Sequence, residues 1–205
     1  MTERLRARGF HPAVVLVVII LLLLAYLALA PLERTLGTSL RLILLHGAWV
    51  WTGLLAFALA ALVGLAALLG RKPGLHAWSL ALGRTGLCFW LTYLPMSLAV
   101  MQISWGGFFF DEPRWRIPFA FAVVGVLLQS GLALINIPAA ASVANLAFGV
   151  ALWSILLPAQ NVLHPDSPVL GSDSLRIQLY FGGVLVLTVL AGWQVARLWR
   201  RAGKP

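Results

Sequence analysis

Charged residues are scarce in this chain, and their scarcity excludes a water-soluble fold. Only 10% of the 205 residues are Asp, Glu, Lys or Arg, whereas 61% are hydrophobic. A soluble domain of that composition would expose far too much apolar surface to water. The chain also has a single cysteine, Cys88. An internal disulfide bond is therefore excluded, and we expect Cys88 to act as a small packing residue.

The signatures of several enzyme classes are missing as well. The sequence has no Walker motif, no G-x-S-x-G and no H-E-x-x-H, so it gives no sign of nucleotide hydrolysis, α/β-hydrolase or zinc protease chemistry. No acidic residue lies in the middle of an apolar run, which leaves proton or ion transport without an obvious carrier. We expect the polar residues of these runs to bridge helices. The ones that stand out are Gln102, Gln129, Ser130 and Asn145.

Long apolar runs are what the chain has instead. A membrane-spanning helix needs about 20 mostly apolar residues, and each span must satisfy its own backbone hydrogen bonds in lipid. We predict an all-α integral membrane protein, a bundle of six transmembrane helices that forms a single domain over residues 1–205. The first run is expected to be a retained anchor, because it is longer than a signal-peptide core. The predicted spans are 12–31, 45–69, 83–104, 117–136, 139–159 and 176–198.

The distribution of charge predicts the orientation. Loops on the inner side of a membrane carry an excess of Lys and Arg. With the N-terminus inside, ten basic residues and one acidic residue fall on the inner side, against five of each on the outer side. Both termini are therefore predicted to be cytoplasmic, in a bacterial-type inner or plasma membrane. Since the basic excess follows from topology, nucleic acid is not expected as a partner.

Three features meet on the predicted outer side. His46 opens the second span, His164 follows the fifth, and the aromatic segment Trp105–Arg114 joins the third span to the fourth. Neutral imidazole is a common axial ligand of haem iron, and aromatic rings pack well on the flat porphyrin. This combination predicts non-covalent binding of haem b, with His46 and His164 as the two metal ligands.

The other contacts of such a site are also present. Stacking on the porphyrin is expected from Trp105, Phe108, Phe109 and Phe110, with Trp49, Trp51 and Trp115 nearby. Arginine suits the anionic propionates, and the outer arginines are Arg41, Arg114, Arg116 and Arg176. Simpler interpretations remain open, because interfacial tryptophans anchor many membrane proteins and a histidine there is often a surface hydrogen-bonding group. His11 and His76, on the inner side, are predicted to be surface groups.

The aromatic segment resembles the tryptophan-rich periplasmic motif of the haem-handling membrane proteins of cytochrome c maturation, the CcmC and CcsA type. That motif reads approximately W-G-x-W-W-x-W-D-x-R, and this chain keeps its register without a gap. Identical residues are Trp105, Gly106 and Arg114, and related residues are Phe108, Phe109 and Glu112. Asp111 occupies a position where the family has a third tryptophan.

The two histidines extend the resemblance over nearly the whole chain. His46 is similar to the first histidine of the family, which opens an H-V-P-x-x-W pattern. Trp51 keeps the downstream tryptophan, while Gly47-Ala48 replaces Val-Pro. His164 is similar to the second histidine, just beyond the fifth span. The resemblance implies that haem is held by the two histidines, laid on the aromatic segment, and passed to a periplasmic haem chaperone with the help of ABC-type transporter membrane subunits.

Two other functions stay open at this point. A b-type cytochrome subunit in quinone-linked electron transfer would favour histidines buried within the spans, and the sequence has one outer pair instead. An accessory or scaffold subunit of a larger membrane complex would bind no haem, and the low tryptophan content of the motif is compatible with it. The family resemblance favours a holder and presenter of haem, which is not an enzyme.

Overall fold

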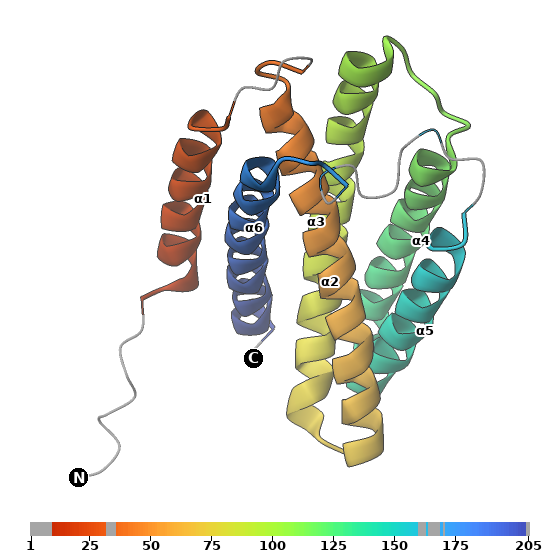
Figure 1. Ribbon diagram of the computed structural model, residues 1–205. Coiled ribbons are helices and arrows are strands. Elements are labelled where there is room, and N and C mark those ends of the chain that lie inside the picture. The colour runs from red at the N-terminus through yellow and green to blue at the C-terminus, as the bar shows by residue number, and fades with distance from the viewer. Residues whose placement is uncertain (1–9, 32–35, 160–162, 164–168, 170, 204–205) are drawn as a thin grey trace.

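The chain forms a bundle of helices in the computed structural model, which describes residues 10–31, 36–159, 163, 169 and 171–203. Each predicted span overlaps one helix, so the all-helical fold is confirmed. The helices of the described part are α1 (Pro12–Ala28), α2 (Leu40–Gly70), α3 (Pro73–Trp105), α4 (Pro113–Ile135), α5 (Pro138–Leu156) and α6 (Leu175–Ala202) (Figure 1).

The helices α2 to α6 are each long and apolar enough to cross a membrane, and α1 is shorter. With 17 residues, α1 is about 26 Å long, slightly less than the roughly 30 Å of a bilayer's hydrocarbon core. It ends three residues before Pro31, because the residue before a proline disfavours helical geometry. The amides of Leu29 and Ala30 close the last turn on the carbonyls of Tyr26 and Leu27, at 3.0 and 3.1 Å.

The helices α2 and α3 form the central antiparallel pair of the bundle. They have 31 and 33 residues, or about 46 and 50 Å, and so reach beyond the other helices at both ends (Figure 1). Arg71, in the left-handed conformation with φ 49°, closes the turn between them. Glycine permits their close contact: a Cβ atom on Gly86 would lie 2.7 Å from the ring of Phe57. In the view of Figure 1, α4 and α5 lie on one side of the pair, and α6, with α1 packed on it, lies on the other.

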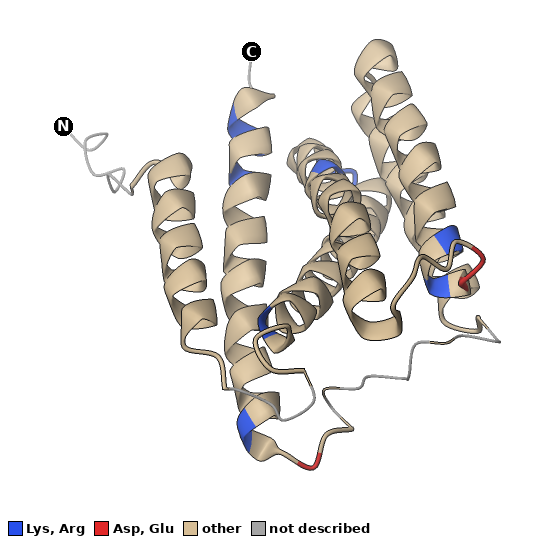
Figure 2. Cartoon of the chain, turned by 90° about the horizontal axis from the view of Figure 1, so that it is seen from above, with Lys and Arg blue, Asp and Glu red and all other residues tan. Residues whose placement is uncertain are grey.

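Alternate helices run in opposite directions, which gives the bundle two distinct ends. We call the end where α2, α4 and α6 begin the upper end, and the end where α1, α3 and α5 begin the lower end (Figure 1). The start of α1 and the end of α6 share the lower end. In the described part of the chain, acidic residues occur only at the starts of α4 and α6, each beside arginines (Figure 2).

Buried polar side chains join α3, α4 and α5 in the lower half of the bundle. Asn145 donates to the Ser79 carbonyl at 2.9 Å, and Gln129 donates to the Asn145 side-chain oxygen at 3.0 Å. The prediction that Gln129 and Asn145 bridge helices is therefore confirmed. His76 is half-buried with Nδ1 2.7 Å from the Ser142 hydroxyl, so its prediction as a surface group was wrong. His11 is exposed, as predicted.

Candidate functional site at the upper end

His46 lies in the second turn of α2 and is half-buried. Its imidazole faces α3, where the ring of Tyr93 lies 5.2 Å away, centroid to centroid, with the planes 35° apart. One turn further along α2, the indole N–H of Trp49 donates to the Thr92 hydroxyl at 2.7 Å. These two contacts fix the rotation of α2 against α3 and hold the imidazole at the upper end.

Tyr93 connects His46 to the motif residue Arg114. Its hydroxyl donates to the Arg114 backbone carbonyl at 3.0 Å. In a regular helix that carbonyl would accept the amide N–H four residues later, but the residue there is Pro118, which has no N–H. Within lipid a carbonyl released in this way needs another donor, and Tyr93 provides one. Tyr93 thus ties the start of α4 to the level of His46.

Trp90 reinforces the same junction one turn below Tyr93. It is fully buried, and its indole N–H donates to the carbonyl of Pro118 at 2.9 Å. Its ring packs on Tyr93 at 5.4 Å and on Phe57 of α2 at 5.7 Å. Trp90 thus connects α2, α3 and α4 directly beneath the histidine.

The aromatic segment begins where α3 ends, at Gly106 in the left-handed conformation with φ 71°. The three phenylalanines that follow are 55%, 40% and 53% exposed, in chain order Phe108, Phe109 and Phe110. Phe108 stacks on Phe110 at 6.0 Å, and Trp105 meets Phe109 edge-on at 5.7 Å. The segment thus presents aromatic surface outward and buries little of it.

The aromatic surface continues along α4. Phe110 contacts Trp115 at 5.1 Å, and Trp115 stacks on Phe119 at 5.1 Å with the planes 10° apart. We call the rings of Phe108, Phe110, Trp115 and Phe119 the aromatic row. The indole nitrogen of Trp115 is buried and has no hydrogen-bond acceptor among the described residues.

Glu112 is the acidic motif residue and is only 4% exposed. It occupies the N-cap position of α4 without a side-chain capping bond, and one carboxylate oxygen accepts the backbone N–H of Leu163 at 2.8 Å. The other has no donor within the described residues. Leu163 immediately precedes His164 in the sequence, and His164 itself lies outside the described residues. Glu112 therefore holds the residue next to the second predicted ligand against the start of α4.

The predicted propionate partners divide into two groups. Arg114 and Arg116 belong to the first turns of α4, beside the aromatic row, whereas Arg41 starts α2 and Arg176 starts α6. The helices α4 and α6 make no contact with each other. A single haem on the aromatic row would therefore meet the α4 arginines, and the other two belong to a separate surface.

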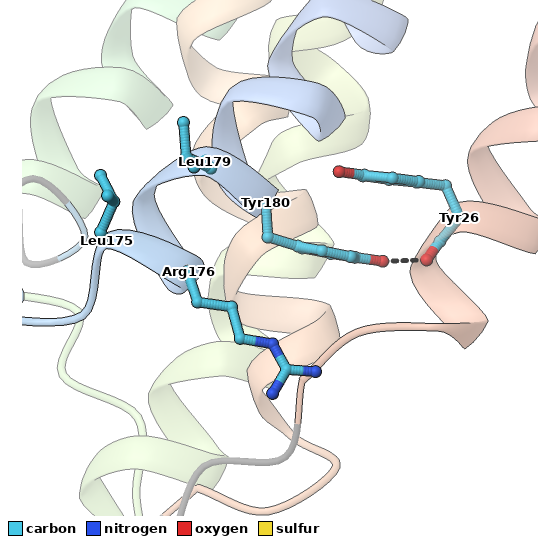
Figure 3. Close-up of a pocket in the computed structure, with 5 residues that line it drawn as sticks. All are labelled: Tyr26, Leu175, Arg176, Leu179 and Tyr180. Carbon is cyan, nitrogen blue, oxygen red and sulfur yellow. Dashed lines mark hydrogen bonds between the residues drawn. The ribbon is translucent and has the colours of Figure 1, made fainter.

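That separate surface contains a pocket of about 450 Å³ between α1 and α6 (Figure 3). Its lining includes Arg176 and the stacked rings of Tyr26 and Tyr180, whose centroids are 4.4 Å apart. The Tyr180 hydroxyl donates to the Tyr26 carbonyl and fastens α1 to α6. Since this bond holds the short helix α1 against α6, it accounts for the two tyrosines without a ligand in the pocket.

Trp51 lies on a different side of α2 from His46. Five residues apart on a helix place two side chains about 140° apart around the axis, and Trp51 is 39% exposed. It is Trp49, bonded to α3, that is the ordered indole near the histidine. The motif spacing alone does not distinguish these two tryptophans, because both follow His46 within two turns.

Sequence reasoning did not identify Tyr93, Trp90 or Pro118 as parts of this site. The signal was present: a tyrosine and a tryptophan inside an apolar span need acceptors, and a proline inside the next span frees one. Their pairing, however, requires knowing that the middle of α3 is level with the start of α4. In the described part of the chain, the candidate site included, no group of three or more His, Cys, Asp and Glu side chains is placed to hold a metal ion.

No family model and no curated protein matches this chain. The argument for its function therefore rests on the residues at the upper end and their geometry.

Proposed function

We propose that this protein binds haem b non-covalently at the upper end of the bundle and presents it for cytochrome c maturation. The observation that carries the proposal is the link from His46 through Tyr93 to the Arg114 carbonyl, because it holds an imidazole level with the end of the aromatic motif at the start of α4. The aromatic row adds an exposed stacking surface.

Each group at the upper end has a role in this proposal. His46 and His164 would hold the haem iron through their imidazoles. The surface under the porphyrin would be formed by Trp105, Gly106, Phe108, Phe109 and Phe110. Haem itself supplies an iron that takes two such ligands. The arginines Arg114 and Arg116 suit the propionates. Glu112 holds the chain next to His164 in place. We assign no bond-making step, so the protein is not an enzyme.

The charge distribution supports a membrane orientation for this proposal. In the described part of the chain, the lower end carries basic residues without acidic ones, and the upper end carries both. By the positive-inside rule the lower end is cytoplasmic and the upper end periplasmic, in a plasma membrane that α1 also crosses. The partners would be a periplasmic haem chaperone and the membrane subunits of an ABC-type transporter.

An absorption spectrum of the detergent-purified protein, oxidised and then reduced with dithionite, tests the proposal. We expect the sharp reduced bands of a bis-imidazole haem, which are lost or shifted in His46→Ala and in His164→Ala. His11→Ala is the matched control, because His11 is exposed at the lower end. Its spectrum should equal that of the wild type.

A protein from haem-replete cells that holds no haem, and takes up none on addition, would contradict the proposal. It would favour the accessory subunit instead. The aromatic row supports that second candidate, because exposed aromatic surface is also what a protein partner covers. In that case the two histidine substitutions would leave assembly of the complex intact.

A further inference from the structure

The lower end contains a small cavity between α3 and α6 that is lined by two arginines. Its volume is about 40 Å³, and Arg84 of α3 and Arg200 of α6 both line it. Two guanidinium groups around one cavity repel each other, and no acidic residue of the described part lies at this end to compensate. A bound anion would remove that repulsion.

Tryptophan rings hold both arginines in place. The Arg84 guanidinium carbon lies 5.3 Å from the ring centre of Trp199, and that of Arg200 lies 5.2 Å from Trp78. Trp78 in turn stacks on Trp193 at 5.0 Å. Cation–π contact uses the face of a guanidinium and leaves its N–H groups available. These arginines are therefore oriented and can still donate hydrogen bonds.

The hydrogen bonds at the lower end also indicate that an arginine of the cavity has a donor available. The Arg200 Nε is buried and has no acceptor among the described residues. The neighbouring Arg197, which does not line the cavity, instead donates to the side chain of Gln194 at 2.9 Å. At the cavity, one buried arginine donor thus lacks an acceptor among the described residues.

The size and walls of the cavity identify the class of anion. A volume of about 40 Å³ holds roughly three water molecules, so a phosphate group fits and a porphyrin does not. The remaining wall is partly apolar, with Ala77, Leu80 and Ala81, which suits the glycerol and acyl chains of a lipid. We infer that Arg84 and Arg200 bind the phosphate of an anionic phospholipid from the leaflet at the lower end.

Thermal unfolding of the full-length protein in non-ionic detergent tests this inference. The additions are phosphatidylglycerol, phosphatidylcholine and inorganic phosphate at equal concentration. Phosphatidylglycerol at about 100 times its dissociation constant should raise the midpoint by about 8 °C. The other two should have little effect, because the choline cation of phosphatidylcholine neutralises its phosphate and inorganic phosphate has no acyl chains.

The same rise in the unfolding midpoint is then measured for Arg84→Gln, Arg200→Gln and Arg200→Lys. Each variant is compared with and without lipid, so a change in its stability without lipid does not affect the result. Both glutamine variants should lose the shift, and lysine should weaken it, since lysine cannot donate in the planar fork of arginine. Arg201→Gln, an exposed neighbour outside the cavity, should keep the full shift. An equal shift with inorganic phosphate, or one unchanged in both glutamine variants, would overturn the lipid site.

Discussion

The two ends of this bundle solve the problem of polar groups in a membrane in different ways. In the lower half, Asn145 donates to the carbonyl and the hydroxyl of Ser79 and accepts from Gln129, so one polar network joins three helices. Towards the upper end, side chains of α3 bond backbone carbonyls of α4 beside a proline, as Tyr93 and Trp90 do. The lower contacts hold the helices together. The upper contacts place an imidazole and a motif at one level while aromatic rings stay exposed.

The comparison indicates where substitutions should change the stability of the fold and where they should change the affinity for a ligand. Some side chains of the lower half are fully buried, as Ser79 and Ser142 are, and there is no space for a ligand beside them. The aromatic row is the opposite case, because Phe108 and Phe110 are about half exposed. A ligand that covers them gains apolar burial that the folded chain does not gain by itself.

The largest loss of stability should come from adding a side chain at Gly64, where α2 packs tightly against α3 and α5. A Cβ atom there would lie 2.9 Å from the Ser142 backbone oxygen and 2.9 Å from the Ser79 hydroxyl. We expect Gly64→Val to destabilise the fold by about 3 kcal/mol and lower the unfolding midpoint by about 9 °C. Gly131→Val is the control, because nothing lies within 4 Å of that position. Equal midpoints for the two variants would show that the lower half is not tightly packed.

A smaller effect is expected from the bond between Tyr93 and the Arg114 carbonyl. Tyr93→Phe should cost about 1 kcal/mol, in the range of buried hydrogen bonds within membranes. Pro118→Ala restores the N–H that this carbonyl lacks, so Tyr93→Phe should cost less in that background. A double-mutant cycle of unfolding free energies measures the difference. Strict additivity would mean that the proline does not create the need for the tyrosine.

The aromatic row should affect ligand affinity without affecting the fold. Phe110→Ala should weaken haem binding about fivefold, since one aromatic contact contributes about 1 kcal/mol. The unfolding midpoint of the haem-free protein should stay unchanged. Leu127→Ala, on the exposed side of α4 at 68% exposure, controls for the loss of apolar surface. Haem titration followed by absorbance measures both variants, and equal affinities would remove the row from the site.

The smallest effect is expected at Trp51. Because it points away from His46 around α2 and is 39% exposed, Trp51→Leu should leave haem affinity and stability nearly unchanged. Trp49→Phe, which removes the N–H bonded to Thr92, should weaken haem binding measurably. The reverse order in the same haem titration would place Trp51 in the site, as the spacing of the family motif implies.

Much of the fold was predictable because membrane spans are encoded locally. Apolar runs located all the helices of the described part, and the bridging role of Gln129 and Asn145 followed from their isolation in apolar surroundings. The end of α1 was placed too late, since the apolar residues continue past the last helical turn to Pro31. His76 was misjudged because the loop sequence does not reveal that α5 brings Ser142 to it.

The candidate site was predictable only in part. The predicted topology placed His46 and the aromatic segment at one end of the bundle, but it did not show what aligns them. The alignment depends on Tyr93 meeting a carbonyl beside Pro118 on another helix. Such a contact depends on the vertical offset of two helices, and α3 extends well beyond the start of α4 (Figure 1). No pattern within either helix specifies that offset.

The most direct test of the central claim, that His46 is a ligand of haem iron at the upper end, is rescue by imidazole. His46→Gly removes the side chain and leaves space for a free imidazole. We predict that the ferric haem spectrum of this variant is high-spin, and that millimolar imidazole restores the low-spin spectrum of the wild type. His11→Gly should be low-spin throughout. A His46→Gly variant that is low-spin without imidazole and identical to the wild type would contradict the account.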